Sequence, residues 1–194
     1  MCNVTLVEAP TSAGAYAPGQ EDGPGALVDA GLVALGVAHM LDLDGTVDGL
    51  AALAGQRPML SAGQVSLLGL GPHTDFEAKV IADRVLPVVD VLSMASDPVG
   101  SARTALVPLA ACDGLAIHFD VDLVDFLDAP LAENTDRGIA PSLTACGEAL
   151  RELLADRRVR ALTITEFNPH HGSQDGDTTQ RLLDVLVSAL RAAA

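Results

Sequence analysis

The chain has few aromatic residues, and this limits what its hydrophobic core can contain. Aromatic residues make up only 3% of the 194 positions, with no Trp and one Tyr. Hydrophobic residues still amount to 49% of the sequence, which is enough to bury a core in one domain of this length. We therefore expect residues 1–194 to form a single domain whose core is built from Ala, Val, Leu and Ile.

The chain is also poor in basic residues. It has 11 Lys and Arg against 26 Asp and Glu, which gives a formal net charge of −15. Such a balance excludes a typical nucleic-acid-binding protein, because that function needs a basic surface. It favours the attraction of a small cationic molecule.

Long apolar runs and a paired set of cysteines are missing too. The longest apolar run, residues 31–41, is interrupted by His39 and is too short to cross a bilayer. The amino terminus lacks the basic segment of a signal peptide. Cys2, Cys112 and Cys146 are scattered and odd in number, which is typical of free thiols in a reducing compartment. We therefore predict a cytoplasmic protein that does not bind membranes.

Short apolar segments alternate with segments of helical periodicity along the whole chain, without repeats. This alternation predicts an α/β fold of three layers, α/β/α, with a mostly parallel sheet. Ser142 is the expected N-cap of one helix. Strands are expected at residues 4–8, 37–43, 65–70, 88–94, 114–121 and 160–165, and helices at 24–36, 75–85, 100–110, 142–156 and 177–192.

Two carboxylates follow one of the expected strands. The apolar run at residues 115–117 is typical of a buried strand. Because side chains alternate along a strand, Asp120 and Asp122 are expected on one face, which His118 shares. Two acids this close repel each other unless a cation lies between them, and carboxylate oxygens suit Mg²⁺, Mn²⁺ or Ca²⁺.

A third acid ends another expected strand. Glu166 follows the β-branched run at residues 161–165 and precedes Asn168-Pro169, which breaks the strand. Ligands of open α/β sheets bind outside the carboxyl ends of the strands. We therefore interpret Asp120, Asp122 and Glu166 as one acidic site.

These segments resemble the arginase/agmatinase (ureohydrolase) family. The resemblance rests on F-D-V-D-x-x-D at residues 119–125, E-F-N-P at residues 166–169 and a closing amphipathic helix. The strand at 65–70 resembles a later family strand. Amino-terminal segments agree as well, namely Val4–Pro10, Gly19, Glu21–Pro24 and Ala30–Leu32.

The resemblance implies an arginase-like fold and a function. Family enzymes hydrolyse a guanidine or amidine C–N bond, in arginine, agmatine or a related substrate, at a centre of two Mn²⁺ ions. By this resemblance Asp120 and Asp122 are metal ligands. Glu166 holds the guanidinium of the substrate through paired, charge-assisted hydrogen bonds.

Two motifs of the family are missing from the chain. Family members carry G-G-D-H-S and D-A-H-x-D before the F-D-V-D strand, and these supply the remaining metal ligands. Residues 45–60 stand where the family has this half, so we interpret them as the site of an internal deletion. Two pairs stay open as replacement ligands, His73 with Asp75 and His170 with His171. The competing interpretations are a helix cap for the first pair and a polar loop for the second.

Two functions therefore stay open. One is a manganese-dependent ureohydrolase acting on a small guanidino substrate; the other is a non-catalytic, internally deleted relative with weak metal binding at most. Ligand count favours the second for this chain alone, because a two-metal centre needs ligands on both ions. We expect His118 to lie buried beneath the site and not to shuttle protons. A homo-oligomer, or a partner at strand edges exposed by the deletion, also stays open.

Overall fold

The fold is described from a computed structural model of the chain, which covers residues 37, 39–44, 46–51, 55–132, 135 and 138–192. The predicted strand 4–8, the predicted helix 24–36, Cys2 and the amino-terminal family segments lie outside these residues. By its internal contacts the chain divides into two compact units. Of the described residues, unit 1 holds 66–72 and 87–192, and unit 2 holds those up to 65 and 73–86.

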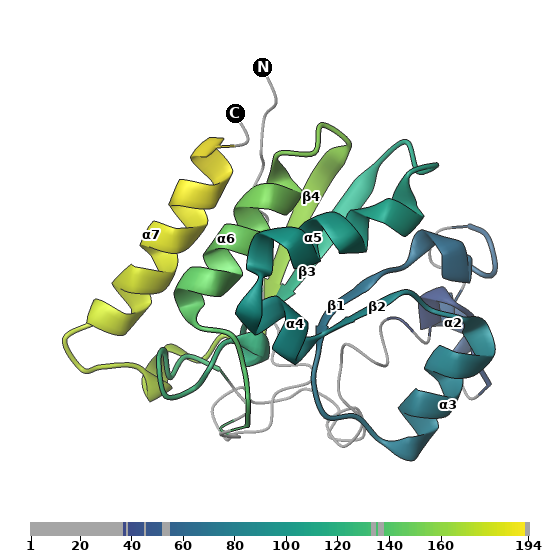
Figure 1. Cartoon of the computed structure of the whole chain (residues 1–194). Helices are drawn as coiled ribbons and strands as arrows, with labels where there is room; N and C mark the ends of the chain where they lie inside the picture. Colours follow the sequence, from purple (N-terminus) through teal and green to yellow (C-terminus); the bar gives the residue numbers. More distant parts are fainter. Residues whose placement is uncertain are drawn as a thin grey trace. The chain divides into compact units, whose positions relative to one another are not determined.

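Unit 1 contains two pairs of parallel strands (Figure 1). β1 (Leu67–Leu70) pairs with β2 (Val88–Asp90), and β3 (Leu115–Asp120) pairs with β4 (Val159–Thr165). The α/β class and the strands predicted at 65–70, 114–121 and 160–165 are confirmed. β1 is irregular at Gly69, whose φ of +79° suits glycine, and a Cβ there would meet Leu123 Cδ1 at 2.6 Å.

The helices of unit 1 agree with the sequence pattern. α6 begins at the predicted N-cap, where Ser142 Oγ accepts the N–H of Ala145 at 3.2 Å. The helices predicted at 100–110, 142–156 and 177–192 are confirmed, with small shifts of their ends. The helices are α4 (Val91–Ser96), α5 (Pro98–Leu106), α6 (Leu143–Leu154) and α7 (Asp177–Ala192), with short 3-10 turns η3 (Val107–Leu109), η4 (Val121–Leu123) and η5 (Pro169–His171).

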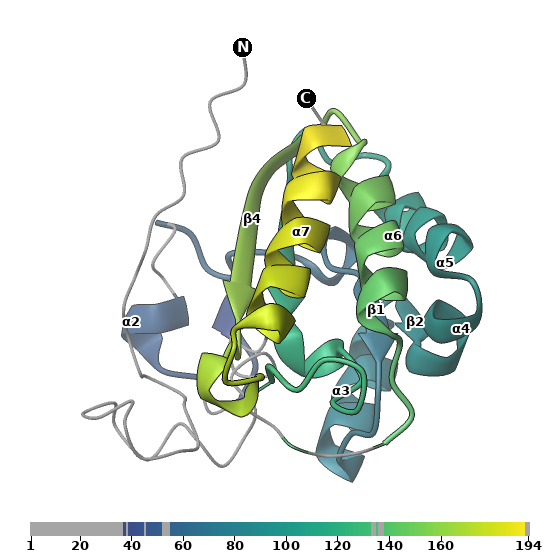
Figure 2. The same cartoon turned by 90° about the vertical axis from the view of Figure 1, so that its left-hand side faces the viewer.

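The core of unit 1 lies between its helices and one face of β3 and β4. Figures 1 and 2 show α5, α6 and α7 as one layer on one side of these strands. α6 and α7 approach closely at Gly147, where a Cβ would lie 2.5 Å from Val185 Cγ1. Burial raises the pKa of the Cys146 thiol to about 12, so this cysteine acts as a core residue. The core includes Phe119 of β3, Cys146, Ala149 and Leu150 of α6, and Leu182 and Leu186 of α7.

The opposite face of β3 and β4 is polar. The register pairs Ala116 with Ala161, His118 with Thr163, and Asp120 with Thr165, so these side chains share one face. The first four are exposed, whereas Asp120 and Thr165 are partly buried. Parallel strands are usually covered on both faces. Within the described part of the chain, this is therefore the more exposed face of the strand pair, and we call it the open face.

Unit 2 is built from short elements, α2 (Asp48–Ala51), η2 (Ala62–Gln64) and α3 (Asp75–Arg84). α3 confirms the helix predicted at 75–85. Its N-cap is Thr74, whose N–H donates to the Glu77 carboxylate at 2.7 Å while Thr74 Oγ1 accepts the N–H of Glu77 at 3.2 Å. This reciprocal capping box explains why the helix starts where it does.

The strand predicted at 37–43 is wrong. Residues 37, 39 and 40 are helical, and the N–H of Leu41 donates to the carbonyl of Val37 at 2.9 Å. The chain then turns at Asp42, whose φ is +52°. The Asp42 carboxylate holds this turn, because it pairs with Arg57 Nε at 2.8 Å and accepts the hydroxyl of Thr46 at 3.3 Å.

The strand predicted at 88–94 ends early, at Asp90. The Asp90 carboxylate accepts both the N–H and the hydroxyl of Ser93, each at 2.8 Å, and so begins α4. An N-cap of this kind overrides the strand expected from the apolar residues that follow. No helix in the described part of the chain is long and apolar enough to cross a membrane.

Candidate acidic site at the strand ends

Asp120 is the last residue of β3, but Asp122 is not on a strand. Asp122 lies in η4, because Asp120 Oδ1 accepts its N–H at 2.9 Å and bends the chain into a turn. The expectation that alternation along one strand carries both acids is therefore wrong. The two acids instead belong to one strand end and the turn that follows it.

The carboxylate of Asp120 is partly buried. Burial raises its pKa above the ordinary value for Asp, and the N–H of Asp122 and the charge of His118 act in the opposite direction to a smaller degree. Desolvation therefore makes the charged form of Asp120 unfavourable. A cation bound at this strand end would offset that cost.

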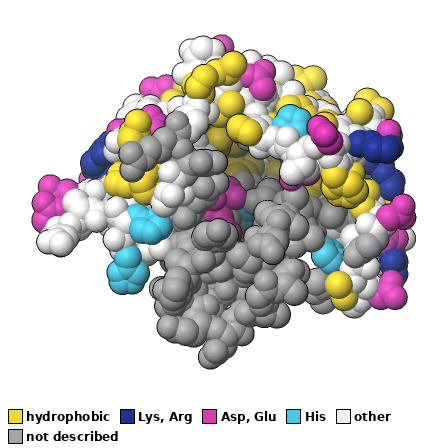
Figure 3. All heavy atoms as spheres, turned by 90° about the horizontal axis from the view of Figure 1, so that it is seen from below, with side chains coloured by type: hydrophobic (Ala, Val, Ile, Leu, Met, Phe, Trp, Pro, Cys, Tyr) yellow, Lys and Arg dark blue, Asp and Glu magenta, His cyan; other side chains and the backbone are white. Residues whose placement is uncertain are grey.

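Glu166 directly follows β4, as predicted. Thr165 stands opposite Asp120 in the register, so Glu166 leaves the sheet one residue after the level of Asp120. β4 runs downward in Figure 2, and its carboxyl end therefore faces the view of Figure 3, where acidic side chains lie near the centre. Glu166 has a φ of 56°, in the left-handed region that non-glycine residues rarely adopt.

Hydrogen bonds anchor the segment that follows Glu166. Phe167 forms an isolated antiparallel bridge with Ala132, and the N–H of Asn168 donates to the carbonyl of Leu131 at 2.7 Å. The buried Asn168 side chain accepts the N–H of His170 at 3.0 Å, which begins η5. Bonds of this kind maintain an unfavourable backbone conformation such as that of Glu166.

His118 is exposed, so the expectation that it lies buried beneath the site is wrong. Its Nδ1 lies 2.8 Å from Thr163 Oγ1, and its Nε2 lies 3.1 Å from Thr165 Oγ1. Sequence reasoning missed both threonines. Their spacing was the available signal, because two residues apart on a strand places them on one face.

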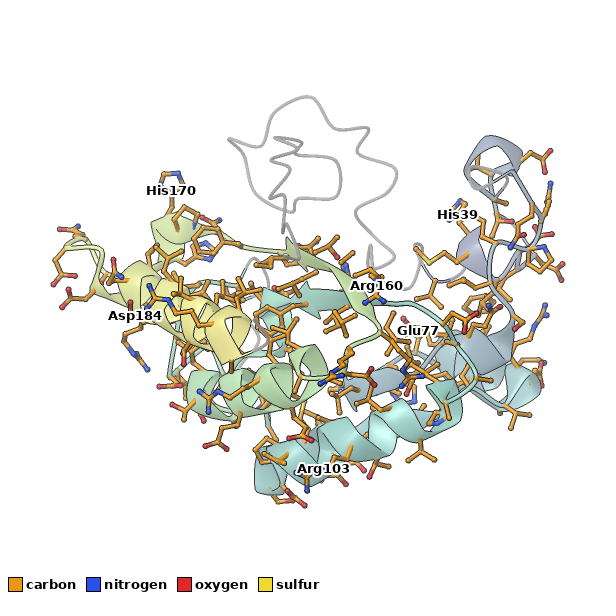
Figure 4. All side chains as sticks on the ribbon, turned by 90° about the horizontal axis from the view of Figure 1, so that it is seen from above. His39, Glu77, Arg103, Arg160, His170 and Asp184 are labelled. Carbon is orange, nitrogen blue, oxygen red and sulfur yellow. The ribbon has the colours of Figure 1, made fainter. Side chains whose placement is uncertain are left out.

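The other candidate ligands lie on η5 and at the start of α3. His171 Nδ1 is 2.8 Å from the carbonyl oxygen of Ala132, and its ring meets Phe126 edge to face at 5.9 Å. His170 points outward from η5 (Figure 4). In unit 2, His73 immediately precedes the N-cap of α3 and Asp75 is the first residue of that helix.

These residues do not fit a two-manganese centre. All five histidines of the chain are among the described residues. Within those residues, no group of three or more His, Cys, Asp and Glu side chains is placed to hold a metal ion. Each ion of a two-metal site needs protein ligands of its own. The described residues therefore do not supply the ligand set of a two-metal centre.

Comparison with known proteins identifies the fold. No protein-family model matches the chain, and no curated protein matches it. The structure is similar to arginase from Bacillus subtilis, with a TM-score of 0.69 and 22% identity over 79% of this chain and 52% of that chain. Helicobacter pylori arginase gives a TM-score of 0.70 at 16% identity, over 81% of this chain and 56% of that one.

Related solved structures extend this likeness. An Entamoeba histolytica arginase in complex with L-ornithine gives a TM-score of 0.68 at 16% identity, over 79% of this chain and 50% of that one. The chain therefore has an arginase-like α/β fold, as the sequence resemblance implied. It spans about half the length of these arginases, which agrees with an internally truncated version of the fold.

Proposed function

We propose that the chain binds a small guanidinium or amidinium cation at Asp120, Asp122 and Glu166 and does not hydrolyse it unaided. The observation that carries this proposal is the burial of Asp120 at the end of β3, level with the residue before Glu166. A buried carboxylate beside a second acid favours a cationic ligand. A guanidinium is planar and presents paired N–H donors, which suits two carboxylates better than an ammonium does.

Two further facts support a cation of this class. The net charge of −15 attracts cations to the molecule in general. One arginase with the same fold was solved with L-ornithine, a small amino acid with a cationic side chain. By resemblance, arginine, agmatine and related guanidines are the first ligands to test.

Hydrolysis needs more than a binding site. It requires a metal-activated hydroxide, a clamp on the guanidinium and a proton for the leaving amine. The donor set of the described residues does not fit the two manganese ions of the family, and this supports binding of the cation without its hydrolysis. The second candidate is a manganese-dependent ureohydrolase, and the arginase-like fold is the observation that favours it.

Binding is tested by titrating methylguanidinium into the protein and measuring heat and carboxylate chemical shifts. The Glu166→Gln variant should bind at least about ten-fold more weakly, because a charge-assisted hydrogen bond is lost. Glu152→Gln is the matched control, since Glu152 lies on α6, outside the proposed site, and pairs with Arg103 at 2.8 Å. Equal affinities of the two variants would contradict the proposal.

Catalysis is tested separately with added Mn²⁺. We expect urea release from arginine and agmatine to stay at background for the 194-residue chain. Steady release that scales with protein concentration and disappears in Asp122→Ala would establish the ureohydrolase instead.

A further inference from the structure

We propose that His118 is a positioning residue that holds Asp120 and Glu166 at the spacing a planar guanidinium requires. This inference rests on the cation binding proposed above. It concerns the open face of β3 and β4, where His118, Thr163 and Thr165 form one hydrogen-bonded group that we name the His118 clamp.

The clamp joins both ring nitrogens of His118 to β4. Thr163 Oγ1 donates to the carbonyl of Ile117 at 3.4 Å, which leaves it to accept from His118 Nδ1–H. His118 Nε2 lies within hydrogen-bond distance of Thr165 Oγ1, at 3.1 Å. Both nitrogens of the imidazole ring thus have a threonine hydroxyl as partner. One ring of β3 therefore ties two residues of β4.

The clamp lies at the carboxyl end of the strand pair. The pairing of β3 with β4 ends at Asp120 and Thr165, so no further rung holds the two carboxyl ends together. Strand ends beyond the last pair of bonded residues open more readily than the rest of a strand. A side-chain tie at the last rung therefore limits the lateral movement of these ends.

The last residue pair of the β3–β4 register affects the position of both Asp120 and Glu166. Asp120 itself belongs to this rung, and Thr165 is the residue immediately before Glu166. The backbone of Glu166 has a left-handed conformation. A shift of Thr165 therefore changes the direction in which the Glu166 side chain leaves the backbone. Loss of the Thr165 hydrogen bond is therefore expected to misplace Glu166 relative to Asp120.

Two cations of equal charge separate positioning from general stability. Methylguanidinium binds two carboxylates through a rigid fork and depends on their spacing, whereas methylammonium is a compact point charge that tolerates a range of spacings. The ratio of their affinities therefore reports the geometry of the site. Unfolding of part of the sample would lower both affinities equally.

The experiment measures both affinities by titration calorimetry at pH 8, where an ordinary histidine is neutral. The variants are His118→Ala, Thr165→Val and Thr165→Ser, with the last keeping the hydroxyl. Thr104→Val is the matched control, because Thr104 Oγ1 donates to the Gly100 carbonyl within α5 at 2.8 Å. Thermal unfolding of each variant is recorded in parallel.

We expect His118→Ala and Thr165→Val to weaken methylguanidinium binding roughly three- to ten-fold, the loss expected for one hydrogen bond. Methylammonium binding should change less than about two-fold, and Thr165→Ser and Thr104→Val should resemble the unmodified protein. An unchanged ratio of the two affinities in His118→Ala and Thr165→Val would overturn the positioning role. If the unmodified protein binds neither cation, the proposed function fails first and the role of His118 fails with it.

Discussion

Two aspartates end parallel strands of unit 1, and they differ in their electrostatics. Asp90 ends β2 and caps α4; Asp120 ends β3 and caps the turn η4. Asp90 is exposed, and hydrogen bonds from Ser93 lower the pKa of its carboxyl group. Asp120 is partly buried, and burial raises its pKa.

The difference separates a structural aspartate from a candidate site. The charge of Asp90 is satisfied by solvent and by the N–H and hydroxyl of Ser93, so it needs no ligand. Asp120 accepts the N–H of Asp122, yet its charged form is still disfavoured. The same local motif therefore stabilises a helix in one place and favours a bound cation in the other.

The largest expected effect is on cation binding. Asp120→Asn removes the charge but keeps the acceptor for the Asp122 N–H, so it should weaken methylguanidinium binding at least about ten-fold. Asp90→Asn makes the same chemical change at the exposed cap and should leave the affinity within about two-fold. Calorimetric titration of methylguanidinium into each of the two variants measures these affinities. Similar losses in both would mean that the burial of Asp120 is not what binds the cation.

The next effect is on stability at pH 7. Asp90→Ala removes the N-cap of α4 and should lower the melting temperature by roughly 2–4 °C. Asp90→Asn should recover most of this loss, because Asn is also a good N-cap. Asp120→Asn should not lower the melting temperature, since it removes a poorly solvated charge. A lower melting temperature for Asp120→Asn would show that its charge stabilises the fold.

The pH dependence of stability should have opposite signs at the two sites. The pKa of Asp90 is lowered in the folded protein, so its contribution is present above the ordinary pKa and is lost as the pH falls through the folded value. The pKa of Asp120 is raised, so its contribution is present at low pH and is lost as the pH rises through the folded value.

Urea unfolding of the two asparagine variants from pH 3 to pH 7 measures this difference. Relative to the unmodified protein, Asp120→Asn should gain stability as the pH rises above about 4, near the ordinary pKa of Asp. Any loss in the free energy of unfolding of Asp90→Asn, relative to the unmodified protein, should become smaller as the pH falls. If the free energies of unfolding of both variants changed with pH in the same way, the opposite signs expected for Asp90 and Asp120 would be wrong.

The smallest expected effect is metal binding. One largely hydrated Mn²⁺ at Asp120 and Asp122 should bind with a dissociation constant on the order of 1 mM, as in weak oxygen-ligand sites. Electron paramagnetic resonance of free Mn²⁺ measures this, and methylguanidinium should compete. Two manganese ions that survive dialysis would refute both the weak site and the ligand count behind it.

Local patterns predicted the features that depend on neighbouring residues. The Ser142 cap and the amphipathic run after it predicted α6, and the apolar run before Asp120 predicted β3. Glu166 at the end of β4 followed from the same reasoning. Prediction failed at 37–43 and 88–94, where Asp42 and Asp90 hold turns or caps through side-chain bonds that apolar periodicity does not reveal.

By itself, the sequence determined the alternating α/β order, the strand ends that carry Asp120 and Glu166, and the resemblance that the arginase-like fold later matched. These depend on periodicity and breakers, which act over a few residues. Only the tertiary structure decided that Asp120 is partly buried while Asp90 is exposed, and that His118 faces Thr163 across 45 positions of sequence. Burial and cross-strand contacts arise from the pairing of distant segments, and no local pattern encodes that pairing.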